Sequence, residues 1–188
     1  MFGLISQRGV YILLKNQVFP DFRRGAAAGM KAQGVELMGT THKEKALALF
    51  DQKYHCSQAV LAAFADECGL TEQQALKLGA CFGGGMRKGE VCGACTGALM
   101  VLGALYGQYD KADPASRETA DSVNIKMMEG FAAVSGSYLC KELLGCDIST
   151  EEGAEYAREH DLFTEFCPQM VANAVDVLEQ IIQEQAED

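Results

Sequence analysis

The chain contains eight cysteines, and their spacing is its most chemically distinctive feature. Cys92 and Cys95 form a Cys-x-x-Cys pair directly after a glycine-rich stretch, and the other six stand at positions 56, 68, 81, 140, 146 and 167. Standing disulfides are rare in a reducing compartment, so this many cysteines indicates metal binding or redox chemistry. Free cysteine is also a small and frequently buried apolar residue, and we expect some of the eight to serve only in packing.

The overall composition narrows the setting in which this chemistry would take place. The 188 residues are 48% hydrophobic and 22% charged, as in a single globular domain with a substantial core. The formal net charge of −10 leaves no basic surface for nucleic acid or for an anionic membrane. No apolar run approaches the roughly 20 residues that span a bilayer, and none resembles a signal-peptide core. We therefore expect a cytoplasmic protein without membrane insertion.

Residues 1–39 differ from the rest of the chain in charge. They carry five basic and two acidic residues, whereas the remainder carries 11 basic and 24 acidic ones. Residues 25–34 are also rich in Ala and Gly. We predict that residues 1–39 form a loosely attached N-terminal extension, with Met38 as a candidate later initiator. Residues 40–188 are predicted to form a helical, cysteine-rich redox domain.

From residue 40 onward, helix caps and stop signals divide the chain into helices that must position the cysteines. Capping boxes occur at residues 41–44 and 71–74, Asp113-Pro114 marks another helix start, and Gly69 and Gly145 mark helix ends. The expected helices span residues 41–50, 54–67, 71–79, 92–106, 114–134, 138–144, 149–160 and 168–182. No strand alternation is evident. The sequence predicts an all-α, compact multi-helix bundle with short loops and a Gly-rich loop before the central helix.

This arrangement places several cysteines in the first turn of a predicted helix. Cys56, Cys92 and Cys95 occupy such positions, and Cys167 directly precedes the start of the last helix. A helix N-terminus offers free amide donors and a partial positive charge, which stabilise the reactive thiolate form. The glycines before Cys92 allow the backbone to approach a sulfur atom closely.

The sequence around these cysteines resembles the C_GCAxxG_C_C family of redox-active proteins. "CGACTG", residues 92–97, matches the CGAxxG signature. "YHCSQAVLAAFADECGL", "FGGGMRKGEVCGACTGALMVLG", "LCKELLGCDIST" and "LFTEFCPQMV" resemble the family's other conserved blocks and follow in the same order. The resemblance covers about residues 43–182.

The resemblance implies a set of four signature cysteines that would bind a cofactor or metal: Cys56, Cys92, Cys140 and Cys167. Cys146 is a reserve ligand in place of Cys140. The family is similar to the iron–sulfur part of split-Soret cytochromes, which implies an iron–sulfur cluster, 2Fe-2S in type, for electron transfer or redox sensing. The backbone amides of Gly93 and Ala94 are candidates for tuning the cluster.

The resemblance leaves other positions with lesser roles. No haem is expected, because covalent attachment requires Cys-x-x-Cys-His and residue 96 is Thr. Cys95 occupies a free position of the motif, and Cys68 and Cys81 are predicted to be packing residues. His55 replaces an expected Asn beside Cys56.

Three alternative functions stay open at this point. The first is a thiol–disulfide oxidoreductase using the redox thiols Cys92 and Cys95, although thioredoxin-like pairs follow a strand and none is predicted here. The second is a structural zinc site, although zinc ligands usually come in close pairs. The third is a helical interaction module with incidental cysteines. No paired acid and base indicates a further catalytic centre, so enzymatic activity is undecided.

The remaining polar residues carry weaker signals. His42, His55 and His160 are isolated from one another in the sequence. Arg87, Lys88 and Glu90 are predicted to be solvated turn residues, with a docking patch for an electron partner as the alternative. The glycine run lacks the Lys-Ser/Thr ending of a phosphate-binding loop. The redox partner is unidentified, and an exposed apolar helix face would permit a homodimer.

Overall fold

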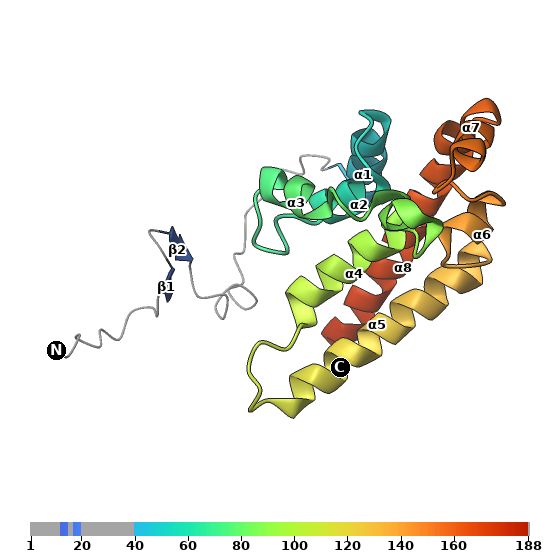
Figure 1. The fold of residues 1–188 in the computed structure, drawn as a ribbon. Coiled ribbons are helices and arrows are strands. Elements are labelled where there is room, and N and C mark those ends of the chain that lie inside the picture. Colours follow the sequence, from blue (N-terminus) through green and yellow to red (C-terminus); the bar gives the residue numbers. More distant parts are fainter. Residues whose placement is uncertain (1–11, 15–16, 20–39, 188) are drawn as a thin grey trace. The chain divides into compact units, whose positions relative to one another are not determined.

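The computed structural model describes residues 12–14, 17–19 and 40–187, and the chain divides into the units Met1–Met38 and Gly39–Asp188 (Figure 1). In the first unit, β1 (Ile12–Leu14) pairs antiparallel with β2 (Gln17–Phe19). The sequence analysis missed this pair, although its β-branched, aliphatic and aromatic residues suit strands. The prediction of a loosely attached extension over residues 1–39 otherwise lies outside the described residues.

The second unit is all-α, which confirms the predicted fold class. Its helices are α1 (His42–Asp51), α2 (Cys56–Ala63), α3 (Glu72–Gly79), α4 (Gly93–Tyr106), α5 (Pro114–Ser135), α6 (Cys140–Leu144), α7 (Glu151–Glu159) and α8 (Cys167–Glu187). Two single wide turns, η2 (Gly85–Gly89) and η3 (Leu162–Phe166), precede α4 and α8. None of the helices within residues 40–187 has the length and apolar character needed to cross a bilayer.

Local signals explain most of the helix boundaries. Both predicted capping boxes are present, with the Thr41 and Thr71 side chains accepting from backbone amides three residues later. Asp113 caps α5 and Pro114 stands in its first turn. The helix predicted over residues 54–67 is shorter, because α2 ends at Ala63 and turns continue to the left-handed Gly69. Such ends depend on local turns that sequence patterns specify less well than the helices themselves.

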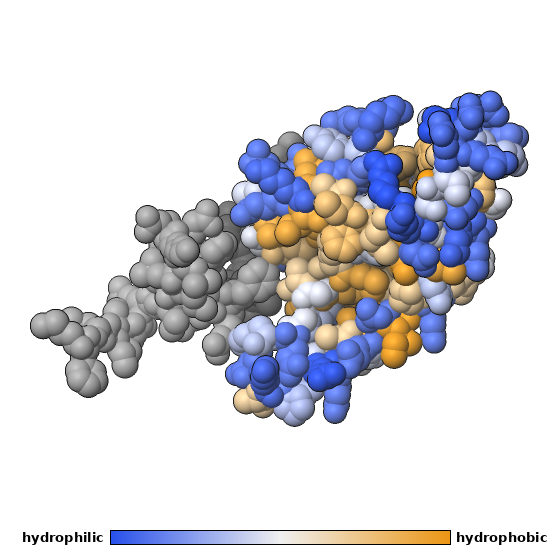
Figure 2. All heavy atoms as spheres, viewed as in Figure 1, coloured by the Kyte–Doolittle hydropathy of each residue, from blue (hydrophilic) through white to orange (hydrophobic). Residues whose placement is uncertain are grey.

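Helix α2 lies at the centre of the hydrophobic core. It packs against α1, α3, α4 and α8, while α5 packs against α4 and α8 (Figure 1). Five consecutive residues of α2, from Ala59 to Ala63, are buried. Gly97 lets α4 approach α2 closely, since a Cβ atom there would lie 2.8 Å from the Ser57 carbonyl oxygen. Figure 2 shows hydrophobic residues gathered over α2 and α4, with hydrophilic residues over α7 and α5.

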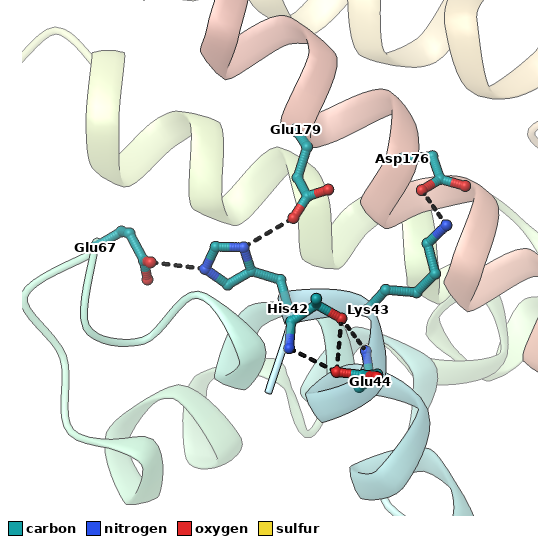
Figure 3. A network of polar contacts seen from close by, with 7 residues as sticks. His42, Lys43, Glu44, Glu67, Asp176 and Glu179 are labelled. Carbon is teal, nitrogen blue, oxygen red and sulfur yellow. Dashed lines mark hydrogen bonds and ion pairs between the residues drawn. The ribbon is translucent and has the colours of Figure 1, made fainter. Parts of the chain in front are cut away.

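The start of α1 is tied to two other parts of the unit. The His42 ring lies between Glu67, at 2.7 Å from Nε2, and Glu179 of α8, at 2.9 Å from Nδ1 (Figure 3). It also stacks on Phe64 with the ring centroids 4.0 Å apart. The neighbouring Lys43 forms an ion pair with Asp176, also on α8. These contacts hold α1 against α8, which carries one of the signature cysteines at its first position.

Candidate functional site

Each of the four signature cysteines stands at the beginning of a helix. Cys56, Cys140 and Cys167 are the first residues of α2, α6 and α8, and Cys92 is the N-cap of α4. The predicted ranges placed Cys92 at a helix start and Cys167 directly before one, whereas the helices of Cys56 and Cys140 were predicted to begin two residues earlier than they do. The site is thus built from the beginnings of four separate helices.

The four helix starts meet at one cavity. Cys56, Cys92, Cys140 and Cys167 all line a cavity of about 510 Å³. Its apolar lining comes from α1, from the chain around α6 and α7, and from the start of α8; the residues are Leu47, Phe50, Leu144, Ile148, Phe163 and Met170. The structure therefore brings the four signature cysteines together, while their role as ligands stays a prediction.

A short backbone pairing brings Cys92 and Cys140 close to one another. A single antiparallel bridge joins Val91 to Leu139. The N–H of Cys92 donates to the carbonyl oxygen of Tyr138 at 2.8 Å. The N–H of Cys140 donates to the carbonyl oxygen of Glu90 at 2.7 Å. The two cysteines therefore occupy diagonal positions on the same face of this ladder. Their proximity arises from backbone hydrogen bonds rather than from helix packing.

Cys56 and Cys92 contact each other directly. The Cys92 thiol donates a hydrogen bond to the Cys56 sulfur, and this bond lowers the pKa of Cys56 to about 7 despite the opposing effect of burial. Backbone N–H groups of Gly84, Ser57 and Cys56 itself contribute in the same direction. Glycine at position 93 leaves room for the Cys56 sulfur, since a Cβ atom there would overlap it unless the sulfur or the backbone shifted. The arrangement favours a thiolate at Cys56.

The other three signature cysteines hold their protons. Hydrogen bonding to Cys56, followed by burial, raises the pKa of Cys92 well above its ordinary value. Burial raises the pKa values of Cys140 and Cys167 to about 12, and the nearby charge of Cys56 acts in the same direction. The site thus favours a thiolate at Cys56 beside three neutral thiols, with the Cys56 thiolate predominating above about pH 7.

Cys95 lies on a different side of α4 from the cavity. Its fully buried thiol donates to the Met128 sulfur at 3.6 Å, and burial raises its pKa to about 12. It does not line the cavity. Cys92 is therefore paired with Cys56 in the structure, and not with Cys95 as the Cys-x-x-Cys spacing had suggested.

The three remaining cysteines differ in their surroundings. Cys146 is half-buried and near enough to influence Cys140 electrostatically, although it does not line the cavity. Cys68 is buried, which confirms its predicted packing role. The same prediction is wrong for Cys81, which is exposed because it follows the end of α3 in a surface turn.

The glycine-rich loop forms a left-handed turn that contributes to the cavity. Backbone φ is positive at Gly84, Gly85, Met86 and Arg87, a conformation that costs about 1–2 kcal/mol for each non-glycine residue. Arg87 lines the cavity and lies 3.3 Å from the ring nitrogen Nε2 of His55. Arg87 is exposed in this turn, which confirms the prediction of a solvated turn residue; that it also lines the cavity was not predicted. The turn directs it toward the site.

Two further basic residues of the cavity were missed by the sequence analysis. Lys53, just after α1, and Arg158, on α7, both line it. No motif marks either residue, and both belong to segments outside the cysteine pattern. Lys53 has a left-handed φ of 72°, which no local sequence signal predicts. Of the isolated histidines, His55 lines the cavity, whereas exposed His160 stacks on Tyr156 with centroids 3.9 Å apart.

The thiols of Cys56, Cys92, Cys140 and Cys167 line the wall of a cavity. Within residues 40–187, no group of three or more His, Cys, Asp or Glu side chains has the arrangement needed to hold one metal ion. The donor set itself, four thiols on one cavity, has the softness and number that iron–sulfur clusters require. A cluster contains several atoms and spreads its ligands more widely than one ion does. The number and type of the donors, rather than a preformed arrangement around one ion, are what match a cluster.

The fold and the cavity together define an all-α protein with four thiols gathered from four helix starts. Residues 54–181 match the family model described as "Putative redox-active protein (C_GCAxxG_C_C)". The chain belongs to this redox-active family, as the resemblance in the sequence indicated. Neither the comparison with curated proteins nor the comparison with solved structures found a match.

Proposed function

We propose that this protein transfers single electrons, or senses redox state, through an iron–sulfur cluster bound by Cys56, Cys92, Cys140 and Cys167. The observation that carries the proposal is that these four cysteines, which begin or cap four different helices, line one cavity of about 510 Å³. Four cysteine thiolates are the usual ligand set of such clusters. A bound cluster supplies a one-electron redox couple.

The surrounding backbone is suited to stabilise negative charge on the sulfur atoms. Amide N–H groups of Gly84 and Ser57 point at the Cys56 sulfur, and the Ala94 amide donates to Cys92. Such donors favour the more negative, reduced state and so raise the reduction potential. Binding requires Cys92, Cys140 and Cys167 to lose their protons, which makes cofactor uptake dependent on pH.

Anaerobic purification followed by iron and sulfide analysis tests the proposal. The wild-type protein is expected to be brown, and Cys92→Ser is expected to lose both the colour and the iron. Cys81→Ser is the matched control, because Cys81 is exposed and does not line the cavity. A colourless wild-type protein that takes up no iron after anaerobic reconstitution would contradict the proposal. Comparing Cys140→Ser with Cys146→Ser identifies which of these two is the ligand.

The hydrogen bond between Cys92 and Cys56 favours a second candidate function, thiol–disulfide exchange. The Cys56 thiolate would attack a substrate disulfide, forming a mixed disulfide and releasing one substrate thiolate. Cys92, losing its proton to that thiolate, would then attack the Cys56 sulfur and release the second. The protein ends as a Cys56–Cys92 disulfide, and the substrate disulfide is reduced to one thiol and one thiolate, which takes up a proton from water.

Peptide mapping after mild oxidation distinguishes this second function. The expected result is a reversible Cys56–Cys92 disulfide that forms equally well in Cys95→Ser, because Cys95 contacts Met128 instead. A Cys92–Cys95 disulfide, or no disulfide at all in metal-free protein, would contradict it.

A further inference from the structure

Three basic side chains line the cavity alongside the thiols. They are Lys53, Arg87 and Arg158, and the only carboxylate among the lining residues is Asp51. The chain as a whole has a formal net charge of −10. A concave surface that gathers positive charge in an acidic protein attracts anions, because field lines are focused in a cleft with low-dielectric walls. Counting Asp51 and a thiolate at Cys56, the lining carries three cations against two anions, so a positive excess is left for a ligand.

Within residues 40–187, these basic groups form no ion pair with a carboxylate. Among residues 40–187, Lys43, Lys126 and Lys141 form ion pairs with Asp176, Glu184 and Glu90. In the same part of the chain, no ion pair includes any of the three basic residues of the cavity. Arg87 does have a polar contact, with the His55 ring at 3.3 Å, but that partner is not a carboxylate. The three cations are thus available to an anionic ligand.

Two of the three are held in an unfavourable backbone conformation. Lys53 has φ 72° and Arg87 has φ 60°, both in the left-handed region that is disfavoured for residues with a Cβ atom. In the described part of the chain, only Met86 and Asp161 share this property among non-glycine residues. Strained residues of this kind cluster at ligand clamps and active sites. Glycine would relieve the strain at either position but would remove the charge.

The rest of the lining is mainly apolar. Leu47, Phe50, Ile148 and Phe163 lie on the same cavity as the basic residues. Its volume of about 510 Å³ falls within the range of small-molecule sites. Apolar walls with a few charged groups select a ligand that has a hydrophobic body and a charged end.

We propose that this cavity binds a small organic anion, with its acidic group on Lys53, Arg87 and Arg158 and its apolar body beside the thiols. The inference goes beyond the redox centre proposed above. It applies to the cavity whose thiols are free or engaged in disulfide exchange, because a cluster on four thiolates would add negative charge beside the three cations. The anion would be held next to the thiols.

Calorimetric titration of the full chain with two matched probes tests this proposal. Anilinonaphthalene sulfonate carries the charge, and phenylnaphthylamine has the same rings without it. Arg87→Gln and Arg158→Gln are each expected to weaken sulfonate binding about tenfold and to leave binding of the neutral probe unchanged. Lys77→Gln, which removes an exposed charge on α3 outside the cavity, is the control.

Arg87→Gly separates the ligand role from a structural one. It removes both the charge and the backbone strain, so we expect a higher unfolding midpoint together with weaker sulfonate binding. Sulfonate affinity equal to wild type in Arg87→Gln and Arg158→Gln would overturn the proposal, as would an equal loss for both probes. Iron content is measured on the same preparations, so failure of the anion site is distinguishable from failure of the cluster proposal.

Discussion

Cys56 is the residue on which the electrostatics of the site depend. Its sulfur accepts hydrogen bonds from the Cys92 thiol and from backbone N–H groups, including that of Gly84 in the left-handed turn. The negative charge of the Cys56 thiolate helps to raise the pKa values of Cys140 and Cys167. A single thiolate among neutral thiols is a suitable first ligand for an incoming metal and also a suitable nucleophile. Both functions proposed above therefore begin at this sulfur.

Alkylation of the reduced, metal-free protein is expected to single out Cys56 from Cys95. Alkylating agents react with the thiolate, so the rate at Cys56 should have its midpoint near the pKa of about 7 and level off about one pH unit above it. Cys95, whose pKa burial raises to about 12, should stay unmodified over the same range. Brief iodoacetamide pulses followed by peptide mass spectrometry measure both rates. A Cys56 rate that still increases beyond about pH 8.5, as for an ordinary thiol, would contradict the expectation.

Gly93→Ala is expected to disturb the contact between α4 and Cys56. The added Cβ atom would overlap the Cys56 sulfur, so the sulfur or the helix start must move. We expect a loss of about 1–3 kcal/mol in the free energy of unfolding and reduced iron retention. Gly103→Ala is the matched control on the same helix, because its Cβ atom meets nothing within 4 Å. That change should stabilise the helix by about 0.5–1 kcal/mol. Urea unfolding of both variants checks the difference in sign.

At the scale of elements, the site depends on connections that hold helix starts in place. The bridge between Val91 and Leu139 aligns the beginnings of α4 and α6. The ion pair between Glu90 and Lys141, at 3.3 Å, links the same two segments through side chains. At the other side of the core, His42 links α1 to α8 (Figure 3). These links combine short-range turns with contacts between residues far apart in the sequence.

The His42 links predict a stability that depends on pH. Burial opposes protonation of His42, but hydrogen bonds to Glu179 and Glu67 outweigh it and raise the pKa of the ring above 6.5. When folding raises the pKa of a group, protonation of that group stabilises the folded protein. The stabilisation is complete at pH values below the pKa in the unfolded chain, and it disappears as the pH rises through the pKa in the folded protein. The side chains of His42, Glu67 and Glu179 are 34%, 43% and 44% exposed, so solvent screens their interaction. We therefore expect it to contribute only about 0.5 kcal/mol to the free energy of unfolding.

Urea midpoints of wild type and His42→Gln, compared at about pH 6 and about pH 8.5, measure this contribution. The variant should be less stable than wild type at the lower pH and should approach it at the higher pH. His160→Gln is the control, because exposed His160 stacks only on Tyr156 within its own helical segment. A difference between wild type and His42→Gln that is the same at both pH values would contradict the assignment.

At the scale of the whole molecule, the helices were predictable because their signals are local. The boxes at residues 41–44 and 71–74 and the Asp113-Pro114 start each occupy a few consecutive residues, and all three are present. Apolar residues also recur at helical spacing along α8, and Met170, Val171 and Leu178 of this series are buried. Local hydrogen bonding and helix periodicity are sufficient for such features.

The details of the site were less predictable because they arise from tertiary contacts. The Cys-x-x-Cys spacing does not show that Cys95 faces Met128 while Cys92 faces Cys56. The bridge that places Cys140 beside Cys92 joins segments almost fifty residues apart and lacks any strand pattern. The left-handed conformations of Lys53 and Arg87 are likewise imposed by their surroundings. The resemblance to the family identified the four signature cysteines, but not the basic lining of their cavity.

A substitution far from the cavity tests whether the helical unit unfolds as a whole. Phe131 on α5 is fully buried in the same continuous core that contains Cys95 and α2. Phe131→Ala should therefore lower the free energy of unfolding by about 3–5 kcal/mol. Ile125→Ala on the same helix, where the side chain is 55% exposed, should change it by less than about 0.5 kcal/mol.

Because one core joins α5 to α2 and α4, loss of helix signal and exposure of the Cys95 thiol should occur at the same urea concentration in every variant. Circular dichroism and reaction with a thiol reagent follow the two events. Separate midpoints would show that the part containing α5 unfolds independently of the part that carries Cys56.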